Sequence, residues 1–299
     1  MYNKTFFLML CFILLSVSVQ AGVPEPSPAG GNYLALDGKD DYAVLDFSKF
    51  GVLFKEGTRD LTVEAWIYPT SKPEGNTIAV LFRQQVDIEL YGDDTPSYQE
   101  IKKRIGWKKG DLLLFMSAFI NVNGNIGWTG SRDITLSPYQ WHHIAFQLQF
   151  PNGAIWICDN QSATSLVPTT VEHDLSKISQ LTFMPDKSFV LGGYGDKIPV
   201  PESKSFFGSF AGYIDEVRIS NIARYDIAEK HTIPQGKFET DANTIALWHF
   251  DEPFGTMTFL DSSGNGRNLI GKNGATTGRA FAMNSNGKLT TTWSAIKTK

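Results

Sequence analysis

Apolar and polar residues alternate with a period of two along most of this chain, and this pattern excludes most folds. Six runs follow it, all rich in β-branched and aromatic residues: LTVEAWIYP (61–69), LLLFMSAFI (112–120), WHHIAFQLQF (141–150), AIWIC (154–158), SFVLGG (188–193) and FAGYIDEVRIS (210–220). Turn signals made of Gly, Asn and Pro separate the runs. Only NIARYDIAEKH (221–231) has a helical pattern. Because each strand has one apolar face that must pack on a second sheet, we predict an all-β antiparallel sandwich with minimal helix.

The composition is that of a folded protein with no expected affinity for polyanions. Of the 299 residues, 42% are hydrophobic and 13% are aromatic, which is enough apolar surface for a core. Lys and Arg number 27 against 31 for Asp and Glu, so the net charge is −4. Because there is no basic excess to displace phosphate counterions, nucleic acid is not an expected partner.

Residues 1–21 have the parts of a signal peptide. Lys4 gives a positive start, an apolar stretch follows, and Val19 and Ala21 are the small residues of a cleavage site. The alternative is a membrane anchor, but this stretch is shorter than the about 20 apolar residues that a spanning helix needs. The segment 22–32, which contains Pro and Gly, predicts a flexible leader. We therefore predict a secreted protein, extracellular or periplasmic, without an integral membrane span.

Cysteine usage predicts a fold that does not depend on disulfides. Cys11 lies in the apolar part of the signal peptide, so Cys158 alone remains after cleavage. A single cysteine cannot form an intrachain disulfide. Its context, AIWICDN, alternates in the manner of a strand, which predicts a small buried residue and not a nucleophile.

Four segments in a fixed order resemble the successive signatures of a known family. They are LALDGKDDYAVL (34–45), LTVEAWIYPT (61–70), QWHHIAFQ (140–147) and GYIDEVRISNIARY (212–225). Together they are similar to a laminin-G-like jelly-roll domain, a member of the concanavalin-A-like lectin and glucanase superfamily, over residues 33–235. The resemblance implies a jelly roll. The family often has Gly in the turn where this chain has Asn160, a residue that also tolerates a left-handed backbone.

The segment 236–299 contains a further family signature, at 244–272, which often opens such a domain but here follows the others. One interpretation is a truncated second repeat. The other is that these strands complete the sandwich of residues 33–235 in permuted order. A lone pair of strands is not stable in water, so we expect the second arrangement.

Tryptophans supply the first candidate binding residues. Trp66 and Trp141 lie in strand-like runs, and we expect them to fill the space between the sheets. Trp107, in the polar insertion 92–110, and Trp128 lie among Gly and polar residues near predicted loops. An exposed indole at a loop can stack on the apolar face of a sugar ring, so Trp107 and Trp128 are candidate ligand-binding residues. The alternative is that they anchor loops by packing.

Calcium is the one metal that the pattern favours. Asp37-Gly38-Lys39-Asp40-Asp41 is an oxygen-rich turn, and oxygen ligands are those that a hard cation needs. Many laminin-G-like and lectin relatives bind calcium, and the resemblance makes Asp37, Asp41 and Asp215 the first candidate ligands. The alternative is that these residues only form turns.

Catalytic patterns are weak, so we expect no enzyme activity. A retaining glycosidase needs two carboxylates about 5–5.5 Å apart, and Asp87 and Glu89 share a strand face. However, Gln85 stands where the related glucanases have their nucleophilic Glu. The sequence therefore predicts a secreted, non-catalytic module that binds glycans or glycoproteins through loops at the sandwich edge, with calcium assisting. The alternatives are a protein–protein adhesion or surface-assembly domain and, less favoured, a glycoside hydrolase.

Overall fold

A computed structural model describes residues 24–55, 58–92, 103, 108, 110–122, 125–149, 153–165, 180–181, 188–200, 203–226, 229 and 231–279. The predicted signal peptide over residues 1–21, most of the insertion 92–110 and the chain after 279 lie outside these residues. Within the described part, no helix has both the length and the apolar character to cross a membrane.

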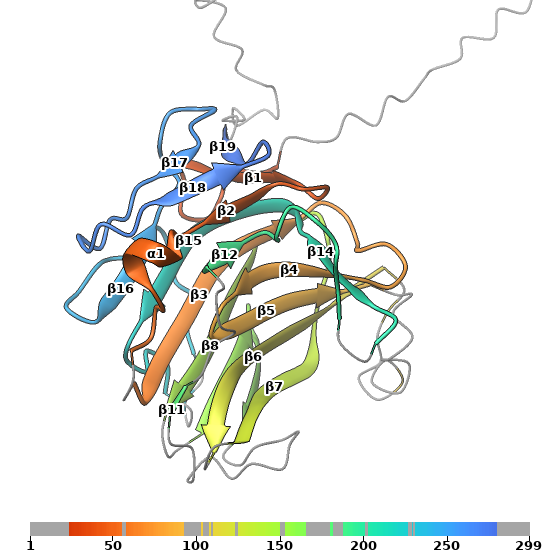
Figure 1. Cartoon of the computed structure of the whole chain (residues 1–299), viewed down its shortest axis with the longest axis vertical. Helices are drawn as coiled ribbons and strands as arrows, with labels where there is room; N and C mark the ends of the chain where they lie inside the picture. Colours follow the sequence, from red (N-terminus) through yellow and green to blue (C-terminus); the bar gives the residue numbers. More distant parts are fainter. Residues whose placement is uncertain are drawn as a thin grey trace, which may run out of the picture.

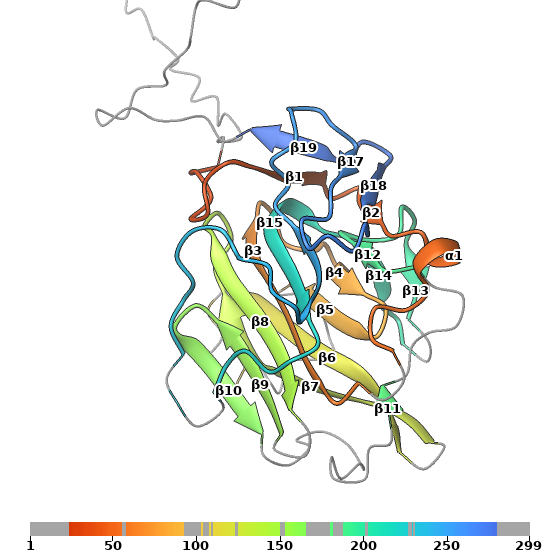
Figure 2. The same ribbon diagram turned by 90° about the vertical axis from the view of Figure 1, so that its left-hand side faces the viewer.

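The described chain folds into two sheets packed face to face, which confirms the predicted β-sandwich (Figures 1 and 2). The first sheet contains, in spatial order, β10 (Gln161–Ser165), β9 (Gly153–Cys158), β8 (His142–Gln149), β3 (Asp60–Pro69), β15 (Ala211–Ser220), β1 (Asn32–Asp37) and β19 (Thr276–Arg279), with β16 (Thr244–Trp248) also on β15. The second sheet contains β11 (Gln180–Leu181), β6 (Leu112–Val122), β5 (Val86–Tyr91), β4 (Thr77–Arg83), β12 (Val190–Leu191), β2 (Tyr42–Val44), β18 (Leu269–Lys272) and β17 (Thr258–Phe259), with β7 (Asn125–Leu136) on β6, β14 (Phe206–Ser209) on β4 and β13 (Ile198–Pro199) on β14. A short helix, α1 (Phe47–Phe50), lies between β2 and β3. All described pairs are antiparallel except β14 with β4.

The core lies between the two sheets and follows from the period of two. In β3, the alternate residues Leu61, Val63 and Ile67 all belong to the main core cluster and are at most 1% exposed. Trp156 of β9 is buried in the same cluster, and its Nε1 donates a 2.7 Å hydrogen bond to the carbonyl of Met116 in the opposite sheet. An indole buried with its N–H paired both fills volume and fixes the spacing of the two sheets.

Strands from the last part of the described chain pair with strands from its start. β19 pairs with β1 in the first sheet, and β18 pairs with β2 in the second. β16 pairs with β15, the long strand that also contacts β1 and β3. The strands of residues 244–279 thus contribute to both sheets of one sandwich and do not form a separate pair (Figure 2).

The predicted helix over 221–231 is wrong for residues 221–226, which form bends over the outer face of the first sheet. The backbone N–H groups of Arg224 and Tyr225 donate to Oε1 of Gln147 at 2.7 and 2.8 Å. The Tyr225 hydroxyl donates to Oε2 of Glu64 at 2.5 Å. Since these N–H groups bond to side chains of the sheet, they are not available to carbonyls one helical turn earlier.

Candidate functional site

A cleft of about 390 Å³ enters the sandwich at one end, where turns from both sheets meet. Three short segments form its walls: 37–39 after β1, 71–74 between β3 and β4, and 209–211 between β14 and β15. Ala79, Leu90 and Phe210, all buried, close its base. The position follows from the fold, because strands end here and turns carry the side chains that solvent and ligands can reach.

The rim of the cleft carries both signs of charge. Lys39, Lys72 and Lys197 supply ammonium groups, and Asp37 and Glu74 supply carboxylates. Ser71, Thr77 and Ser209 add hydroxyl groups between them. Within the described chain, the side chains of Glu74 and Lys197 make no ion pair and no hydrogen bond, and both residues are exposed. Such groups are free to donate to and accept from the hydroxyl groups of a ligand.

The predicted calcium turn lies at this end of the sandwich. Carboxylate oxygens of Asp37, Asp40 and Asp41 all lie within 4.8 Å of one another. The turn is held by its own bonds, since Asp41 Oδ2 accepts the N–H of Asp37 at 3.1 Å and Asp37 Oδ1 accepts the N–H of Lys39 at 2.8 Å. The structure therefore brings together two of the three predicted ligands, Asp37 and Asp41, and adds Asp40.

The electrostatics of this turn suit a hard cation. Burial raises the pKa of the Asp41 carboxyl, and the charges of Asp37 and Asp40 raise it further. Only Lys39, 3.7 Å from Asp37, offers a nearby opposite charge among the ion pairs of the described chain. A Cβ at Gly274 would lie 2.6 Å from Asp41 Oδ1, so glycine leaves the space that this oxygen needs. Three close carboxylates supply the oxygen ligands that calcium accepts.

Asp215, the third predicted ligand, lies elsewhere. In β15 it is paired with Trp66 of β3, whereas Asp37 is paired with Ala211. Four residues of strand separate these positions by about 13 Å. Asp215 is fully buried, and burial raises the pKa of its carboxyl well above the usual range. A buried carboxyl that is distant from the acidic turn does not complete that cation site.

The tryptophans have different environments. Trp107 lies outside the described residues, and only the backbone of Trp128 is described, in β7 opposite Phe119. Trp66 is buried but not between the sheets, because it packs on Phe238 over the outer face of the first sheet. Trp141 also belongs to this outer cluster, and its Nε1 donates to the carbonyl of Glu25. The expectation that Trp66 and Trp141 fill the space between the sheets is therefore wrong.

The acid pair of the hydrolase alternative is built into a buried network. Asp87 and Glu89 lie on β5 and are 5% and 3% exposed. Both form ion pairs with Arg83, at 3.3 and 3.4 Å, and Glu89 also accepts a 2.6 Å hydrogen bond from the hydroxyl of Tyr91. Burial raises the pKa of Asp87 well above its usual range. Because the Arg83 guanidinium pairs with both acids, we interpret these carboxylates as part of a structural ion-pair network and not as a catalytic pair.

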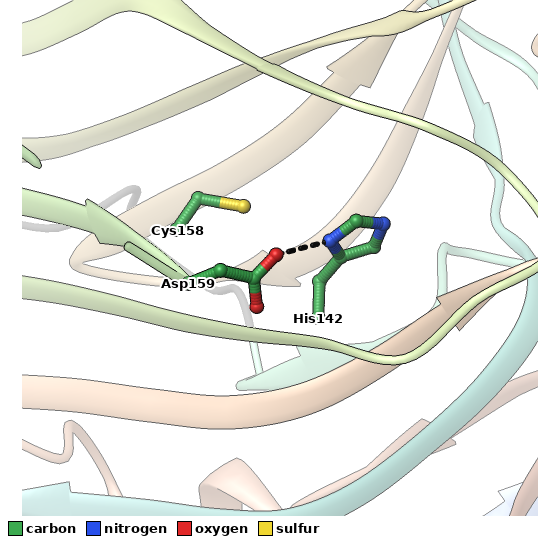
Figure 3. Close-up of side chains that lie close together, drawn as sticks. All are labelled: His142, Cys158 and Asp159. Atoms are coloured by element: carbon green, nitrogen blue, oxygen red, sulfur yellow. Dashed lines mark hydrogen bonds and ion pairs between the residues drawn. The ribbon is translucent and has the colours of Figure 1, made fainter. Parts of the chain in front are cut away.

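A second group contains residue types that can bind metals: His142, Cys158 and Asp159 (Figure 3). Its contacts serve to join β8 to the turn after β9. The Nδ1 of His142 bonds to Asp159 Oδ2 at 2.6 Å, and its Nε2 bonds to the carbonyl of Ser137 at 2.7 Å. Burial raises the pKa of the Cys158 thiol well above its usual value, and the Asp159 charge adds to the effect. Since both ring nitrogens are engaged and the sulfur is a neutral thiol, the group lacks the free ligands that a metal needs.

The same group corrects a detail of the turn after β9. The residue with a left-handed backbone is Asp159, with φ of 52°, and not Asn160. The second carboxylate oxygen of Asp159 accepts the N–H of His143 at 2.9 Å. These bonds hold Asp159 in a conformation that asparagine and aspartate adopt more readily than other residues.

Reasoning from the sequence missed most of the cleft. Lys72 and Glu74 share one turn, Lys197 comes from another turn far along the chain, and no motif marks them. The one available signal was the turn composition SKPEGN (71–76), whose Pro and Gly indicate a surface loop that carries charges.

Comparisons with known proteins support the fold. No protein-family model and no curated protein matches the sequence. A solved structure from Bacteroides ovatus, named as a candidate carbohydrate-binding protein, matches with a TM-score of 0.53 at 16% identity over 84% of this chain. The chain spans 61% of that protein's length. A pentraxin from Limulus polyphemus has a TM-score of 0.41 at 14% identity, over 84% of this chain and 97% of its own. Domains LG4-5 of mouse laminin α1 have a TM-score of 0.38 at 14% identity, over 71% of this chain and 48% of theirs. The two-sheet sandwich and its match to the Bacteroides ovatus structure give the described chain a concanavalin-A-like jelly-roll fold, as the resemblance implied.

Proposed function

We propose that this chain, a concanavalin-A-like jelly roll, is a secreted non-catalytic recognition module that binds glycans or glycoproteins in the cleft at the Ala211 end of β15. One observation carries the proposal: exposed charged groups and hydroxyls from separate turns converge on an opening between the two sheets. Sugar hydroxyls need several donors and acceptors in fixed positions, which turns on a rigid sandwich provide. The carbohydrate-binding description of the Bacteroides ovatus structure agrees with this assignment.

We also propose that calcium orders one wall of this site. Asp37, Asp40 and Asp41 would hold the ion, and its charge would remove the repulsion among their carboxylates. Because Asp37 also lines the cleft, order in this turn would fix one wall of the binding site. Asp215 has no part in this proposal, since it lies apart from the other three residues.

A glycan array with the full chain, repeated with a chelator, tests the proposal. We expect binding to a defined set of neutral glycans, weaker with chelator, and reduced about tenfold in Glu74→Gln or Lys197→Gln. Trp128→Ala tests separately whether aromatic stacking by this residue of β7, which is not among the described residues that line the cleft, contributes to binding. The matched control is Lys272→Gln, an exposed lysine of β18 that does not line the cleft. Glycan binding that is unchanged in both Glu74→Gln and Lys197→Gln would contradict the proposal.

The hydrolase alternative makes a separate prediction. If the chain cleaved glycans, reducing sugar would be released and Glu89→Gln would abolish that release. We expect no release from wild-type protein, because Arg83 bridges Asp87 and Glu89 and both acids are buried. Release that Glu89→Gln removes would assign an enzyme and overturn the non-catalytic proposal.

The protein–protein adhesion alternative is favoured by exposed apolar side chains near β17 and β18. Phe254, Met257, Leu260 and Ile270 are between 38% and 66% exposed. Scattered apolar residues are ordinary on a protein surface, but four in 17 residues of sequence are more consistent with contact to another protein. Failure on all glycans, together with a stable protein partner that Leu260→Ser releases, would favour adhesion over glycan binding.

A further inference from the structure

A second pocket lies at the opposite end of β15 from the cleft. It has a volume of about 250 Å³ and is lined by residues that precede β3, follow β15, and join β15 to β16 and β17 to β18. β15 runs from Ala211 at the cleft to Ser220 beside this pocket, so about 30 Å separates the two sites. In Figure 1, α1 and β16 mark this side of the molecule and β14 marks the other.

The charge of this pocket is of one sign. Lys55 and Arg267 line it, and none of the described residues that line it is acidic. Lys55 is exposed and its ammonium forms no ion pair within the described chain. Two cationic groups without a counterion among the described residues favour an anionic ligand.

The acids of the adjacent turns are already engaged by other groups. Asp241 forms an ion pair with Arg224 at 2.9 Å. Asp261 accepts the backbone N–H groups of Leu247, Ser263 and Arg267 at 3.1, 2.9 and 2.9 Å. These bonds offset the charge of both carboxylates, so they leave the positive potential of Lys55 and Arg267 largely intact.

Arg267 is held in place but keeps unused donors. Its Nη1 donates to the carbonyl of Ile245 at 3.0 Å, which fixes the guanidinium plane. Its Nε is buried without a hydrogen-bond partner, and its Nη2 has none within the described residues. A guanidinium fixed at one nitrogen and free at another matches the geometry of a carboxylate.

Neutral groups complete the lining. Asn221, which is exposed, and Asn243, which is half-buried, line the pocket, and their side-chain amides form no hydrogen bond within the described part. The amide of Asn265 is fixed, since its Nδ2 donates to the carbonyls of Thr244 and Ile245 at 3.1 and 3.0 Å. Amides both donate and accept, which suits the hydroxyl groups of a sugar. The volume is below the about 300–1,000 Å³ of pockets for drug-sized ligands and is that of a site for one small ring.

We infer that this pocket is a second binding site, specific for a carboxylate-bearing sugar such as a uronic acid residue. Lys55 and Arg267 bind the carboxylate, and Asn221 and Asn243 bind ring hydroxyls. A uronic acid has one carboxylate for the two cations of the pocket and hydroxyl groups for its neutral amides. A phosphate dianion has no hydroxyl groups of this kind and would leave the amides without partners. The inference does not depend on the function proposed for the cleft, because the two sites share no lining residue.

Calorimetric titration of the full chain tests this site. The probes are the methyl glycosides of glucuronic and galacturonic acid, those of glucose and galactose, and inorganic phosphate. We expect the uronates to bind about tenfold or more tightly than the neutral sugars and than phosphate, because only they satisfy both cations and amides. Equal affinity for a uronate and its neutral sugar, or tighter binding of phosphate, would overturn the inference.

Variants locate the binding. Lys55→Gln changes an exposed side chain that has no partner among the described residues, so it should fold normally. Arg267→Lys keeps the charge but loses the planar donor pair. Each should weaken uronate affinity at least about threefold. Lys272→Gln, the matched loss of a lysine charge beside Tyr42, should not. Unchanged uronate affinity of Lys55→Gln would contradict the proposed site, even if Arg267→Lys did not fold. Glu74→Gln should keep uronate binding, so failure of the cleft is distinguishable from failure of this pocket.

Discussion

The two ends of β15 present different chemistry on the same frame. At the Ala211 end, a cleft of about 390 Å³ carries three lysines and two acids, beside a turn with three close carboxylates. At the Ser220 end, a pocket of about 250 Å³ carries Lys55 and Arg267 and no described acid. Both openings lie where strands of the two sheets end. The comparison teaches that the sandwich fixes the positions of sites, while the turns determine what each site can bind.

The largest expected effect is a loss of folding stability caused by a buried residue that lines neither site. Glu64 is fully buried and bonds to Arg218 at 2.8 Å and to the Tyr225 hydroxyl, which holds the chain that follows Asn221. Glu64→Ala removes the fully buried carboxylate that pairs with the Arg218 guanidinium, whose side chain is 14% exposed, and should lower the free energy of unfolding by about 3 kcal/mol. Urea unfolding measures this loss, with the exposed acid variant Glu74→Gln as the control.

The same variant should distinguish the two ends. Uronate affinity at the Ser220 end should fall, whereas neutral glycan binding at the Ala211 end should persist in the folded fraction. A change in unfolding free energy below about 1 kcal/mol would mean that Glu64 contributes no more than a surface ion pair does.

A smaller effect is expected from the glycine beside the acidic turn. Gly274 has φ of +138°, and a Cβ there would lie 2.6 Å from Asp41 Oδ1. Gly274→Ala should cost about 1–3 kcal/mol through strain and should displace the Asp41 carboxylate. Thermal unfolding with and without calcium measures both consequences. Gly255→Ala is the matched control, since Gly255 has φ of +80° with nothing within 4 Å, and its smaller cost should be independent of calcium.

Salt should act unequally on the two sites. Binding of a uronate to the one-signed pocket should weaken severalfold between about 0.05 and 0.5 M NaCl, because the Debye length falls to a few ångströms. Neutral glycan binding in the cleft should change by less than about twofold, since no ligand charge is involved. Titrations at both salt concentrations check this difference. An equal salt effect at both sites would remove the distinction drawn between them.

The smallest effect concerns pH near the Ser220 end. Hydrogen bonds from Arg224, the largest cause, and Thr244 lower the pKa of Asp241 to about 2 from 3.8. The unfolded chain therefore binds the proton more readily, and this contribution to stability is complete above about pH 4 and is lost as the pH falls to about 2. Because the Asp241 side chain is 43% exposed, the contribution should stay below about 1 kcal/mol.

The melting temperature of wild-type protein and of Asp241→Asn, followed from pH 5 to pH 2, measures this contribution. The two curves should converge at the acid end, where Asp241 is protonated in both states. A constant difference between the curves at every pH would show that Asp241 acts through shape and not through its charge.

Alternation identified several of the strands, but not all of them. β3, β6, β8, β9 and β15 all lie in predicted runs. β4 was not predicted, because all seven of its residues are buried and TIAVLFR therefore has no polar face. Trp66 was assigned to the wrong side of β3 for a related reason, since the chain after β15 covers the outer face and buries it as well.

The candidate sites were less predictable than the fold. Asp37 and Asp41 are neighbours in sequence, so their turn was visible as a cluster of oxygen ligands. Glu74 and Lys197 line the same cleft only because connections of β3, β4 and β14 lie at the same edge of the sandwich. Lys55 and Arg267 are separated by more than 200 residues. They line the same pocket only because of where β16 and β18 join the sheets. Sequence alone carries no signal for such contacts between distant turns.

Hydrogen–deuterium exchange of the full chain, with and without a bound neutral glycan from the array, tests the central claim most directly. The claim is that turns at the end of the sandwich bind the ligand. We predict that protection rises at residues 37–39, 71–74 and 209–211 and stays unchanged at residues 86–89 of β5. Protection confined to Asp87 and Glu89 on the outer face of β5, with no change in the three turns, would contradict the account.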